Sequence, residues 1–575
     1  MALQRAVYRP RDAEHTVLHP VVAEHLEAFL GAAAEAGDGA GLPQFVEREF
    51  REFLTCGVVE HGVARFRCEG CAREHLVPFS CKGRGWCPSC GGRRMTERAA
   101  HLVDAVLPWV PVRQWVLTVP YRLRYQMAWH HGLSRAVLRV YTRVLLDVYA
   151  RGVAGGRTGS VTVMQRAGSG LNVNLHFHTL VLDGVLTEAP GGALAFHPAP
   201  APSDAEVAAA LATIRHRVQR LLVRRGLEPA DDATGPADRL ADESPVLAGI
   251  VGASVQGRVA LGSRAGARVR RLGAERDAAA VTSRGPRQAH LEGFDLHANV
   301  WVSANDRAGV ERLCRYVLRP PFAQERLRLR SDGRVALELK TAWRDGTREL
   351  VFEPLEFLER LAAMTPRPET NLLICHGVLA PRARWRERVV AYGRVLPEPR
   401  AAAAPLAAGP DDARVKPTPR AWTWAALMHR AFAVDVLACP HCGGRLRLIA
   451  TLHDPAVIRK ILAHVGAAPQ GRAPAPPLPS PAPPRPDRNG SGARRTPSCQ
   501  RSEAPSALIR PVRRPVDGGG VSGIAFRSPG PARSTCEEPA NVRCAVGSWG
   551  GRRPSPGGYV AGTGATDGGT AAGGR

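Results

Sequence analysis

The sequence predicts an α+β protein, and three observations support this fold class. Segments 160–166, 171–186 and 294–302 have the apolar patterns typical of strands. Ser134–Tyr149 carries apolar residues at helical spacing, and Ser303–Leu318 begins with cap-type residues and stops before two prolines. Paired cysteines precede these segments in the chain. We therefore expect a mixed domain preceded by a cysteine-rich module.

Composition and spacing predict the segments that flank this domain. Residues 1–45 are rich in Ala and Glu, with apolar residues at helical spacing, and residues 204–226 resemble a basic helix. A Pro/Ala/Gly stretch at 396–420 predicts a linker. Residues 467–575 hold too few large apolar side chains to offset the entropy of ordering, which predicts disorder. This tail has 15 arginines and six acidic residues, a charge of +9.

The net charge of the whole chain is +26, with 78 basic residues of which only four are lysines. Arginine codons are GC-rich, so a GC-rich genome would account for part of this arginine bias, but the positive field remains. Such a field favours a polyanionic partner, and nucleic acid is favoured over a membrane surface. The chain has no run of 18 apolar residues and no apolar signal region at its start. We expect neither a membrane span nor a secretory signal, and a cytoplasmic location.

Four cysteines have the spacing C-x2-C-x15-C-x2-C, which predicts a structural zinc site. They are Cys68, Cys71, Cys87 and Cys90. The alternative, chance cysteines in a reduced protein, is disfavoured by the two pairs. Further candidates lie nearby and could form a second site, exchange with the first set or simply pack: Cys56, His61, His75 and Cys81. Arginines flank the cluster and could contact DNA phosphates: Arg84, Arg93, Arg94 and Arg98.

A second cysteine pair, Cys439 and Cys442, lies far along the chain in a short segment that we expect to fold as a separate module, residues 421–466. The pair could be half of a zinc knuckle completed by His441 or His453. A simple turn is the alternative, because a lone pair is a weak signal.

Two histidines share one face of the strand predicted around 171–186. Alternate side chains of a strand point to the same side, so His176 and His178 lie next to each other, while the odd positions are mainly apolar. This separation suits capture of one cation by both rings. Gln165 on the preceding strand and His297 on a later strand are candidates for a third ligand. Taken alone, the pattern is somewhat better explained by a solvated polar face.

Tyr316 lies beside the apolar stripe of the helix predicted at 303–318, with Arg312 and Arg319 as its neighbours on the helix surface. A phenol has a pKa near 10 and is a poor nucleophile, but nearby guanidinium groups favour the phenolate and can hold a phosphate. The alternative is a half-buried surface tyrosine. Other tyrosines compete for the role of nucleophile: Tyr121, Tyr125, Tyr141 and Tyr149. Core packing is the better interpretation for Tyr141 and Tyr149.

Together these motifs resemble the insertion-sequence-91 family of transposases, within the larger group of HUH single-strand endonucleases. The likeness covers about residues 45–465, and its motifs occur in the expected order. The motifs are Cys68-x2-Cys71, Ser80–Cys90, Leu171–Val185, Glu311–Pro321, His376–Pro381 and the pair Cys439–Cys442. The founding members carry two tyrosines four residues apart. Here Arg312 and Pro320 occupy the positions four residues from Tyr316, so the chain resembles the single-tyrosine branch.

The resemblance implies an HUH catalytic domain: an antiparallel sheet with helices on one side, the histidines on a central strand, and Tyr316 on a helix facing them. It implies His176 and His178 as ligands of Mg²⁺ or Mn²⁺, and Tyr316 as the nucleophile. Single-stranded or locally melted DNA would be cut through a 5′-phosphotyrosine intermediate in rolling-circle-type transposition. The expected domains are 1–45 (helical), 46–104 (zinc-binding, DNA-contacting), 105–395 (catalytic), 396–420 (linker), 421–466 (CxxC module) and 467–575 (tail).

Two other functions remain open from the sequence. One is a zinc-dependent DNA-binding protein without catalysis, which leaves the paired histidines unexplained. The other is a metal-dependent phosphodiesterase that uses water and forms no covalent adduct. The target sequence and the oligomeric state do not follow from the residues.

Overall fold

The computed structural model describes residues 12–227, 238–273, 285–368, 370–394, 423–432 and 434–464. The linker predicted at 396–420 and the tail predicted at 467–575 lie outside these ranges. The chain divides into two units, Met1–Ile458 with Glu538–Arg575, and Arg459–Glu537. Everything described below belongs to the first unit, apart from the end of helix α13 (Pro455–His464). None of the helices in the described ranges has the length and apolar character needed to cross a membrane.

The N-terminal region combines helices with a small sheet, as the composition predicted for its helical start. Trp86 is fully buried here, with its ring centroid 4.9 Å from that of Phe50 and 4.7 Å from that of Phe53. This aromatic cluster joins the loop that follows the small sheet to the second helix. The elements are α1 (Leu18–Glu35), α2 (Gln44–Leu54), β1 (Val63–Cys68), β2 (Glu74–Pro78) and α3 (Pro88–Ala105).

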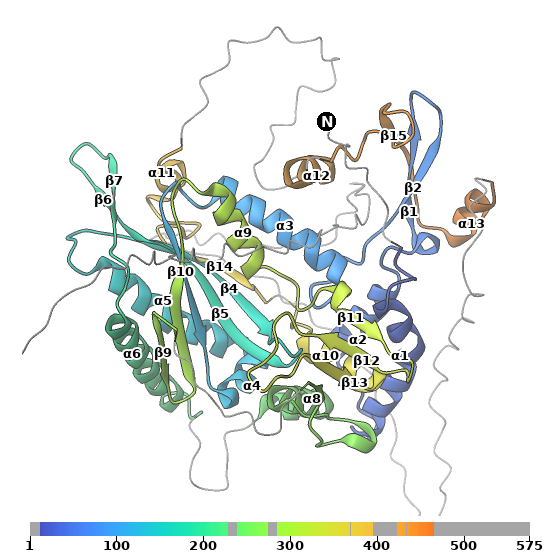
Figure 1. The fold of residues 1–575 in the computed structure, drawn as a ribbon, viewed down its shortest axis with the longest axis horizontal. Helices are drawn as coiled ribbons and strands as arrows, with labels where there is room; N and C mark the ends of the chain where they lie inside the picture. Colours follow the sequence, from blue (N-terminus) through green and yellow to red (C-terminus); the bar gives the residue numbers. More distant parts are fainter. Residues whose placement is uncertain are drawn as a thin grey trace, which may run out of the picture. The chain divides into compact units, whose positions relative to one another are not determined.

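The central sheet has six antiparallel strands in the order β14-β4-β5-β3-β10-β9 (Figure 1). The strands expected at 160–166 and 294–302 are confirmed. The segment expected at 171–186 is instead two strands that separate at Asp183, because the second one leaves the sheet to form a hairpin. The elements are β3 (Val112–Thr118), β4 (Gly159–Ala167), β5 (Val173–Leu182), β6 (Gly184–Glu188), β7 (Leu194–Pro198), β9 (Gln288–Leu291), β10 (Phe294–Val302) and β14 (Leu373–Gly377).

Helices cover both faces of this sheet, which corrects the expectation of helices on one side. The odd face of β5, with Phe177 and Val181, packs in one apolar cluster with α5 and α6. The even face, with Leu180 and Leu182, packs in another with α3 and α9. Both faces of β5 carry large apolar side chains, so both need cover. The helices are α4 (Tyr121–Trp129), α5 (His131–Ala150), α6 (Asp204–Val223) and α9 (Arg307–Val317).

A second sheet of four short strands, in the order β11-β12-β13-β8, was not expected from the sequence. Its apolar side packs in the same cluster as α1, α2, α8 and α10. Its strands have only three or four residues, too few for a clear alternation. The elements are α7 (Arg239–Glu243), α8 (Pro245–Gln256), β8 (Arg270–Leu272), β11 (Leu327–Leu329), β12 (Val335–Glu338), β13 (Glu349–Phe352), α10 (Pro354–Met364) and α11 (Arg386–Ala391).

The C-terminal segment of the described chain returns to the N-terminal region. This corrects the expectation that residues 421–466 fold as a separate module. Strand β15 (Leu446–Leu452) pairs antiparallel with β1 in a three-stranded sheet ordered β15-β1-β2. Helix α12 (Trp424–Phe432) lies against α3, where its Arg430 donates hydrogen bonds to the carboxylate of Asp104. The cysteine-rich part of the fold is thus built from two regions separated by more than three hundred residues in the chain.

A buried ion pair fixes the junction between β5 and β6. The guanidinium of Arg113 donates to both carboxylate oxygens of Asp183 at 2.8 and 2.9 Å, and both side chains are at least 95% buried. Tyr149 of α5 also donates to Asp183 at 2.7 Å. Trp115 donates to the hydroxyl of Tyr149 at 3.1 Å, so the network connects strand β3 to helix α5. Its members satisfy one another away from water, which is the condition for a buried ion pair to be tolerated.

Removal of one partner of this pair is expected to destabilise the protein strongly. Asp183→Ala leaves the Arg113 charge buried without its counter-ion, which costs about 3–5 kcal/mol of unfolding free energy. Glu292→Ala serves as the control, because it breaks the exposed pair with Arg215 and is expected to cost about 0–1 kcal/mol. Urea unfolding of the purified variants measures both. Equal losses would contradict the structural role of Asp183.

Candidate active site and metal centres

The cysteines form two clusters of four, not the single site expected from their spacing. One cluster contains Cys56, Cys81, Cys87 and Cys90. The other contains Cys68, Cys71, Cys439 and Cys442. The structure therefore does not bring Cys68 and Cys71 together with Cys87 and Cys90. The site proposed from C-x2-C-x15-C-x2-C is corrected to two sites, each built from one of those pairs and two other cysteines.

The sulfur atoms have the spacing of thiolate ligands around one ion. In the first cluster, Sγ of Cys56 lies 3.7 Å from that of Cys87 and 3.9 Å from that of Cys90. In the second, Sγ of Cys68 lies 3.4 Å from that of Cys442. Four thiolates around tetrahedral Zn²⁺ at 2.3 Å would lie about 3.8 Å apart, whereas a disulfide would need about 2.05 Å. Both clusters therefore fit a structural zinc ion.

Backbone N–H groups donate to two sulfurs of the second cluster, those of Cys68 and Cys442. The amides of Gly70 and Cys71 donate to Sγ of Cys68 at 3.3 and 3.5 Å, and Gly444 donates to Sγ of Cys442 at 3.4 Å. The backbone N–H of Cys71 is the main reason why the pKa of Cys68 is lowered to about 7. The turns at Cys68–Cys71 and Cys439–Cys442 thus supply N–H groups to sulfur, and such bonds favour the thiolate that a zinc ligand requires.

Strand pairing decides which cysteines share a cluster. Cys68 ends β1 opposite Leu446 of β15, so the turn before β15 brings Cys439 and Cys442 to the end of β1. Cys87 and Cys90 instead lie at the start of α3, next to the end of α2 where Cys56 follows. The sequence had suggested Cys56, Cys81 and the distant pair as optional ligands. Their selection depends on contacts between remote parts of the chain, which local spacing does not reveal.

The two histidines lie where the alternation of the strand predicted, on the even face of β5. Their Nε2 atoms are 3.1 Å apart and their ring centroids 4.8 Å apart. In the register of the sheet, Gln165 of β4 is directly opposite His176, and Val163 is opposite His178. Opposite residues of antiparallel strands share a face, so Gln165 projects to the same side as the histidines.

Both imidazoles are held in their neutral forms. Burial lowers the pKa of His176, and it lowers the pKa of His178 to about 3, with smaller contributions from the charges of His176 and Arg319. Nδ1 of His176 donates to the carbonyl of Asn174 at 2.6 Å, which leaves the Nε2 lone pair available. Nδ1 of His178 lies 2.6 Å from the amide nitrogen Nε2 of Gln114, and the oxygen and nitrogen of such an amide exchange places when it is turned over. An amide turned to present its oxygen there accepts from Nδ1 and equally leaves Nε2 available.

These groups fit a divalent cation. Two adjacent ligands of an octahedral ion with bonds of about 2.1 Å would lie about 3.0 Å apart, close to the observed separation of the Nε2 atoms. Gln114, which orients His178, was missed by the sequence analysis. Gln114 is opposite Leu180 in the register and two residues from Val116, the partner of His178. Its side chain therefore shares the face of the histidines, and this alternation was the signal in the sequence.

Of the two candidates for a third ligand, Gln165 lies nearer in the register. It is on the strand adjacent to the histidines, and its amide nitrogen donates to the backbone carbonyl of Val317 at 2.6 Å. His297 of β10 is opposite Val116 of β3, and Val116 is in turn opposite His178 of β5. Strand β3 therefore lies between His297 and His178. The hydrogen bond of Gln165 also fixes the last turn of α9 to β4.

Tyr316 lies next to the histidines. Its ring centroid is 5.7 Å from that of His178, in an edge-on arrangement, and its side chain is 41% exposed. The guanidinium carbon of Arg319 lies 4.4 Å from the centre of the Tyr316 ring, in a cation–π contact. Arg312 instead pairs with Asp306 at 3.4 Å. The structure thus brings Arg319 to the tyrosine, while Arg312 pairs with the start of its own helix.

The other tyrosines have different surroundings. Tyr141 is fully buried and Tyr149 is 8% exposed, which confirms the core packing expected of both. Burial raises the pKa of each phenol. Tyr125 donates to the carboxylate of Asp238 at 2.6 Å, and its pKa is also raised, mainly by burial. Tyr121 is exposed and lies in a different pocket.

A groove of about 1960 Å³ runs past Tyr316, Gln165 and Arg319. Arg84 and Arg94 of the cysteine-rich region line it, whereas Arg93 and Arg312 are not among the described residues that do so. Basic residues of the second sheet and its loops also line it and were not anticipated. The basic lining residues are Lys82, Arg84, Arg94, Arg98, Arg166, Arg319, Arg326, Lys340 and Arg344. A groove with this lining suits a phosphate backbone.

Helix α12 braces the helix that carries Tyr316. Arg430 of α12 donates to Asp104 of α3 at 2.6 and 2.8 Å and to Glu311 of α9 at 3.0 Å. Glu311 also accepts from Arg315, the residue before Tyr316, at 2.6 Å. The segment that supplies two cysteines to the second cluster therefore also holds α9 against α3.

The two clusters predict two zinc ions per chain, lost separately. Cys442→Ser is expected to remove one of them and to loosen the pairing of β15 with β1, because metal binding there contributes folding free energy. Cys56→Ser is expected to remove the other. Metal analysis of the purified variants by mass spectrometry measures the zinc content. If Cys442→Ser keeps the full zinc content, the second cluster is not a zinc site.

Comparison with protein families agrees with this architecture. Residues 22–119, which include the first cysteine cluster and the Cys68–Cys71 pair, match the family model described as "Transposase zinc-binding domain" of the insertion-sequence-91 group. Residues 159–387, which include both histidines and Tyr316, match the model described as "Putative transposase". Neither the curated proteins nor the solved structures that were compared gave a match. The chain belongs to the insertion-sequence-91 family of transposases and carries an N-terminal zinc-binding domain.

Proposed function

We propose that this transposase nicks and rejoins single-stranded DNA at the ends of a mobile element, with Tyr316 as the nucleophile. The observation that carries the proposal is the position of the Tyr316 ring beside His178, in a groove lined by basic residues. A nucleophile, a candidate cation site and groups that bind phosphate thus converge on one place. Each of these parts contributes to transfer of a DNA strand: the nucleophile attacks, and the cation and the basic groups stabilise the negative charge of the transition state.

In this proposal the phenolic oxygen of Tyr316 attacks the scissile phosphorus in line. The bond from phosphorus to O3′ breaks as the bond to Tyr316 forms, and O3′ takes up a proton while the phenol proton leaves to water. The products are a 5′-phosphotyrosine and a free 3′-OH. Rejoining reverses the step when a 3′-OH attacks the phosphotyrosine. One phosphodiester replaces another, so no ATP is consumed.

The arginine beside the tyrosine supports both parts of the step. The Arg319 guanidinium over the Tyr316 ring stabilises negative charge that develops on the phenol, and it lines the groove where a phosphate would lie. Gln165 holds the last turn of α9 through Val317, which limits the movement of Tyr316 relative to the histidines. Correct placement of the attacking group is itself a large part of catalysis.

His176, His178 and Gln165 would hold Mg²⁺ or Mn²⁺. When bound, the cation supplies Lewis-acid polarisation of the scissile phosphate and neutralises charge in the transition state. Imidazole ligands favour Mn²⁺ over the harder Mg²⁺, and the carbonyl oxygen of Gln165 suits either ion.

A single strand is the favoured substrate because its backbone must reach a phenol that lines a groove. Duplex DNA is stiff over about 150 base pairs, so its phosphates stay on a regular helix. A single strand, or a melted end, can turn one phosphate toward Tyr316 while its neighbours contact the basic residues of the groove.

Tyr316→Phe is expected to abolish the covalent protein–DNA adduct and to leave DNA binding within about twofold, because the lost hydroxyl is the attacking group while the ring still packs. Wild-type protein, a labelled single-stranded element end and Mn²⁺ should give a shifted band on a denaturing gel. Tyr125→Phe is the matched control and should keep the band, since the Tyr125 hydroxyl is bonded to Asp238. Cleavage without any adduct would favour a water-using phosphodiesterase. No cleavage with any metal would favour a DNA-binding protein without catalysis.

The choice of third ligand is tested by the metal dependence of the adduct. Gln165→Ala is expected to raise the Mn²⁺ concentration for half-maximal adduct formation by at least about tenfold, because one of three ligands is lost. His297→Ala, one strand further away, should leave this concentration unchanged. The opposite pattern would assign His297 as the ligand. His176→Ala should abolish the adduct at every Mn²⁺ concentration tested.

A further inference from the structure

A second, smaller pocket of about 410 Å³ lies beside the start of α4. Three arginines, Arg258, Arg268 and Arg271, line it together with Tyr121. The Tyr121 side chain is 54% exposed. Arg122 lies beside it, donating from Nε to the Tyr121 hydroxyl at 3.3 Å, with its guanidinium carbon 6.0 Å from the ring centre. Neither the nucleophile nor the candidate cation site belongs to this pocket, so its charge needs another explanation.

The backbone holds these arginines close together. Arg258 and Arg268 are paired in an antiparallel bridge, which directs their side chains to the same side. Glu359 of α10 accepts hydrogen bonds from the amides of Ala260 and Leu261 at 2.8 and 2.7 Å, which clamps this hairpin to the helix. Like charges brought together on a rigid support repel each other, and an anion bound between them relieves this repulsion.

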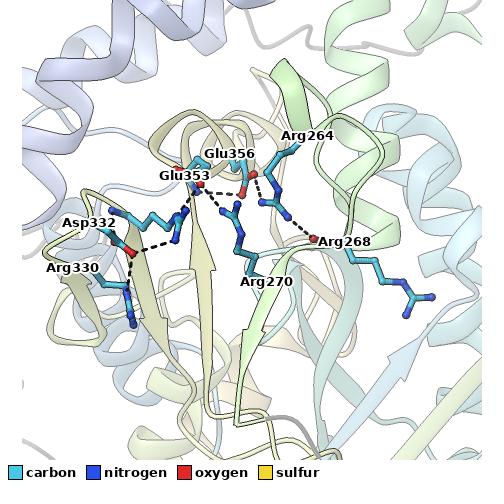
Figure 2. Close-up of polar contacts among 8 residues, drawn as sticks. Arg264, Arg268, Arg270, Arg330, Asp332, Glu353 and Glu356 are labelled. Carbon is cyan, nitrogen blue, oxygen red and sulfur yellow. Dashed lines mark hydrogen bonds and ion pairs between the residues drawn. The ribbon is translucent and has the colours of Figure 1, made fainter. Parts of the chain in front are cut away.

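Most neighbouring arginines are paired with carboxylates, whereas among the described residues two of the three arginines of the pocket, Arg258 and Arg268, are not. Figure 2 shows Arg264, Arg270 and Arg330 directed at the carboxylates of Glu356, Glu353 and Asp332, whereas the Arg268 side chain points away from them. Arg264 also donates to the backbone carbonyl of Arg268 at 3.1 Å, which fixes the chain there. No carboxylate in the described part of the chain pairs with the guanidinium of Arg268 or Arg258. Arg258 donates from one guanidinium nitrogen to the backbone carbonyl of Gly266 at 2.5 Å, which leaves its charge uncancelled.

The pocket is connected to the groove that contains Tyr316. The Arg271 guanidinium lies 4.9 Å from the ring centre of Trp343, and Trp343 lines that groove. Asp345 pairs with Arg271 at 3.0 Å, in an exposed position where the attraction is weak. Basic and aromatic side chains therefore continue from the groove, past Trp343 and Arg271, to Tyr121.

We propose that this pocket is a second site for single-stranded DNA, in which Arg258 and Arg268 hold a phosphate and Tyr121 stacks on a base. It would hold the same strand whose scissile phosphate lies at Tyr316, and so it rests on the proposed function for its choice of ligand. Exposed aromatic rings beside guanidinium groups are the usual means of binding a strand without reading its sequence. The site would anchor the DNA away from the reacting bond.

The test measures binding of a labelled single strand of about 20 nucleotides by fluorescence anisotropy over a range of salt concentrations. All variants carry Tyr316→Phe, so the result does not depend on whether the wild type forms an adduct. Arg268→Gln is expected to reduce the slope of log affinity against log salt by about 0.7, the value for one lost phosphate contact on a single strand. Tyr121→Ala is expected to weaken binding roughly 5- to 150-fold with little change in slope.

Arg330→Gln is the matched control, because it removes the same charge from an arginine that is paired with Asp332. It should leave the salt slope unchanged. Equal slopes for Arg268→Gln and Arg330→Gln would overturn the phosphate site. A blunt duplex of the same length tests the stacking: an equal loss of single-strand and duplex affinity in Tyr121→Ala, or no loss of either, would overturn the role of Tyr121.

Discussion

The packing of α9 on the even face of β5 is the interaction on which the candidate active site depends. Val310, Leu313 and Val317 of the helix are buried in one cluster with Leu180 and Leu182 of the strand. The same face carries the two histidines further along the strand, so burial of its apolar half sets the position of the helix over its polar half. Tyr316, beside the apolar stripe of the helix, then lies next to His178 without any bond between them. Burial of the apolar side chains of α9 and β5 thus positions Tyr316 beside the histidines.

The ends of α9 are held by polar contacts that apolar packing alone would not provide. At its start, Arg307 donates to the carbonyls of Val103 and Pro108 at the end of α3, at 2.6 and 3.0 Å. At its end, Gln165 binds the carbonyl of Val317. Arg430 adds a third contact from a segment that follows in the chain and is anchored through the second cysteine cluster. Because hydrogen bonds are directional, these contacts restrict rotation and sliding of the helix that burial would permit.

The parts of the fold that follow from local periodicity could be predicted from the sequence. The alternation around His176 identified its strand and face, and the cap residues and prolines around Tyr316 bounded its helix. The grouping of the cysteines could not be predicted, because every Cys-x2-Cys turn looks alike and the pairing of β1 with β15 decides which turns meet. The second sheet was not predicted because its strands are too short to show the two-residue alternation of apolar and polar side chains. Helices on both sides of the central sheet could have been inferred from Leu180 and Leu182, which make the even face of β5 as apolar as the odd face at that end.

The arginines of this chain serve two distinct purposes, and the presence or absence of a carboxylate partner distinguishes the two groups. Arg113, Arg264 and Arg430 each meet a carboxylate and hold elements together, so their charge is cancelled within the fold. Arg319 and Arg268 pair with no carboxylate in the described part of the chain and lie in a groove or pocket. The positive charge of Arg319 also contributes to the lowered pKa of His178, so this imidazole stays neutral where a phosphate is attracted. A neutral imidazole can bind a metal ion and a protonated one cannot. Burial keeps the candidate ligands in the neutral form, and the charge that attracts the DNA backbone makes a smaller contribution in the same direction.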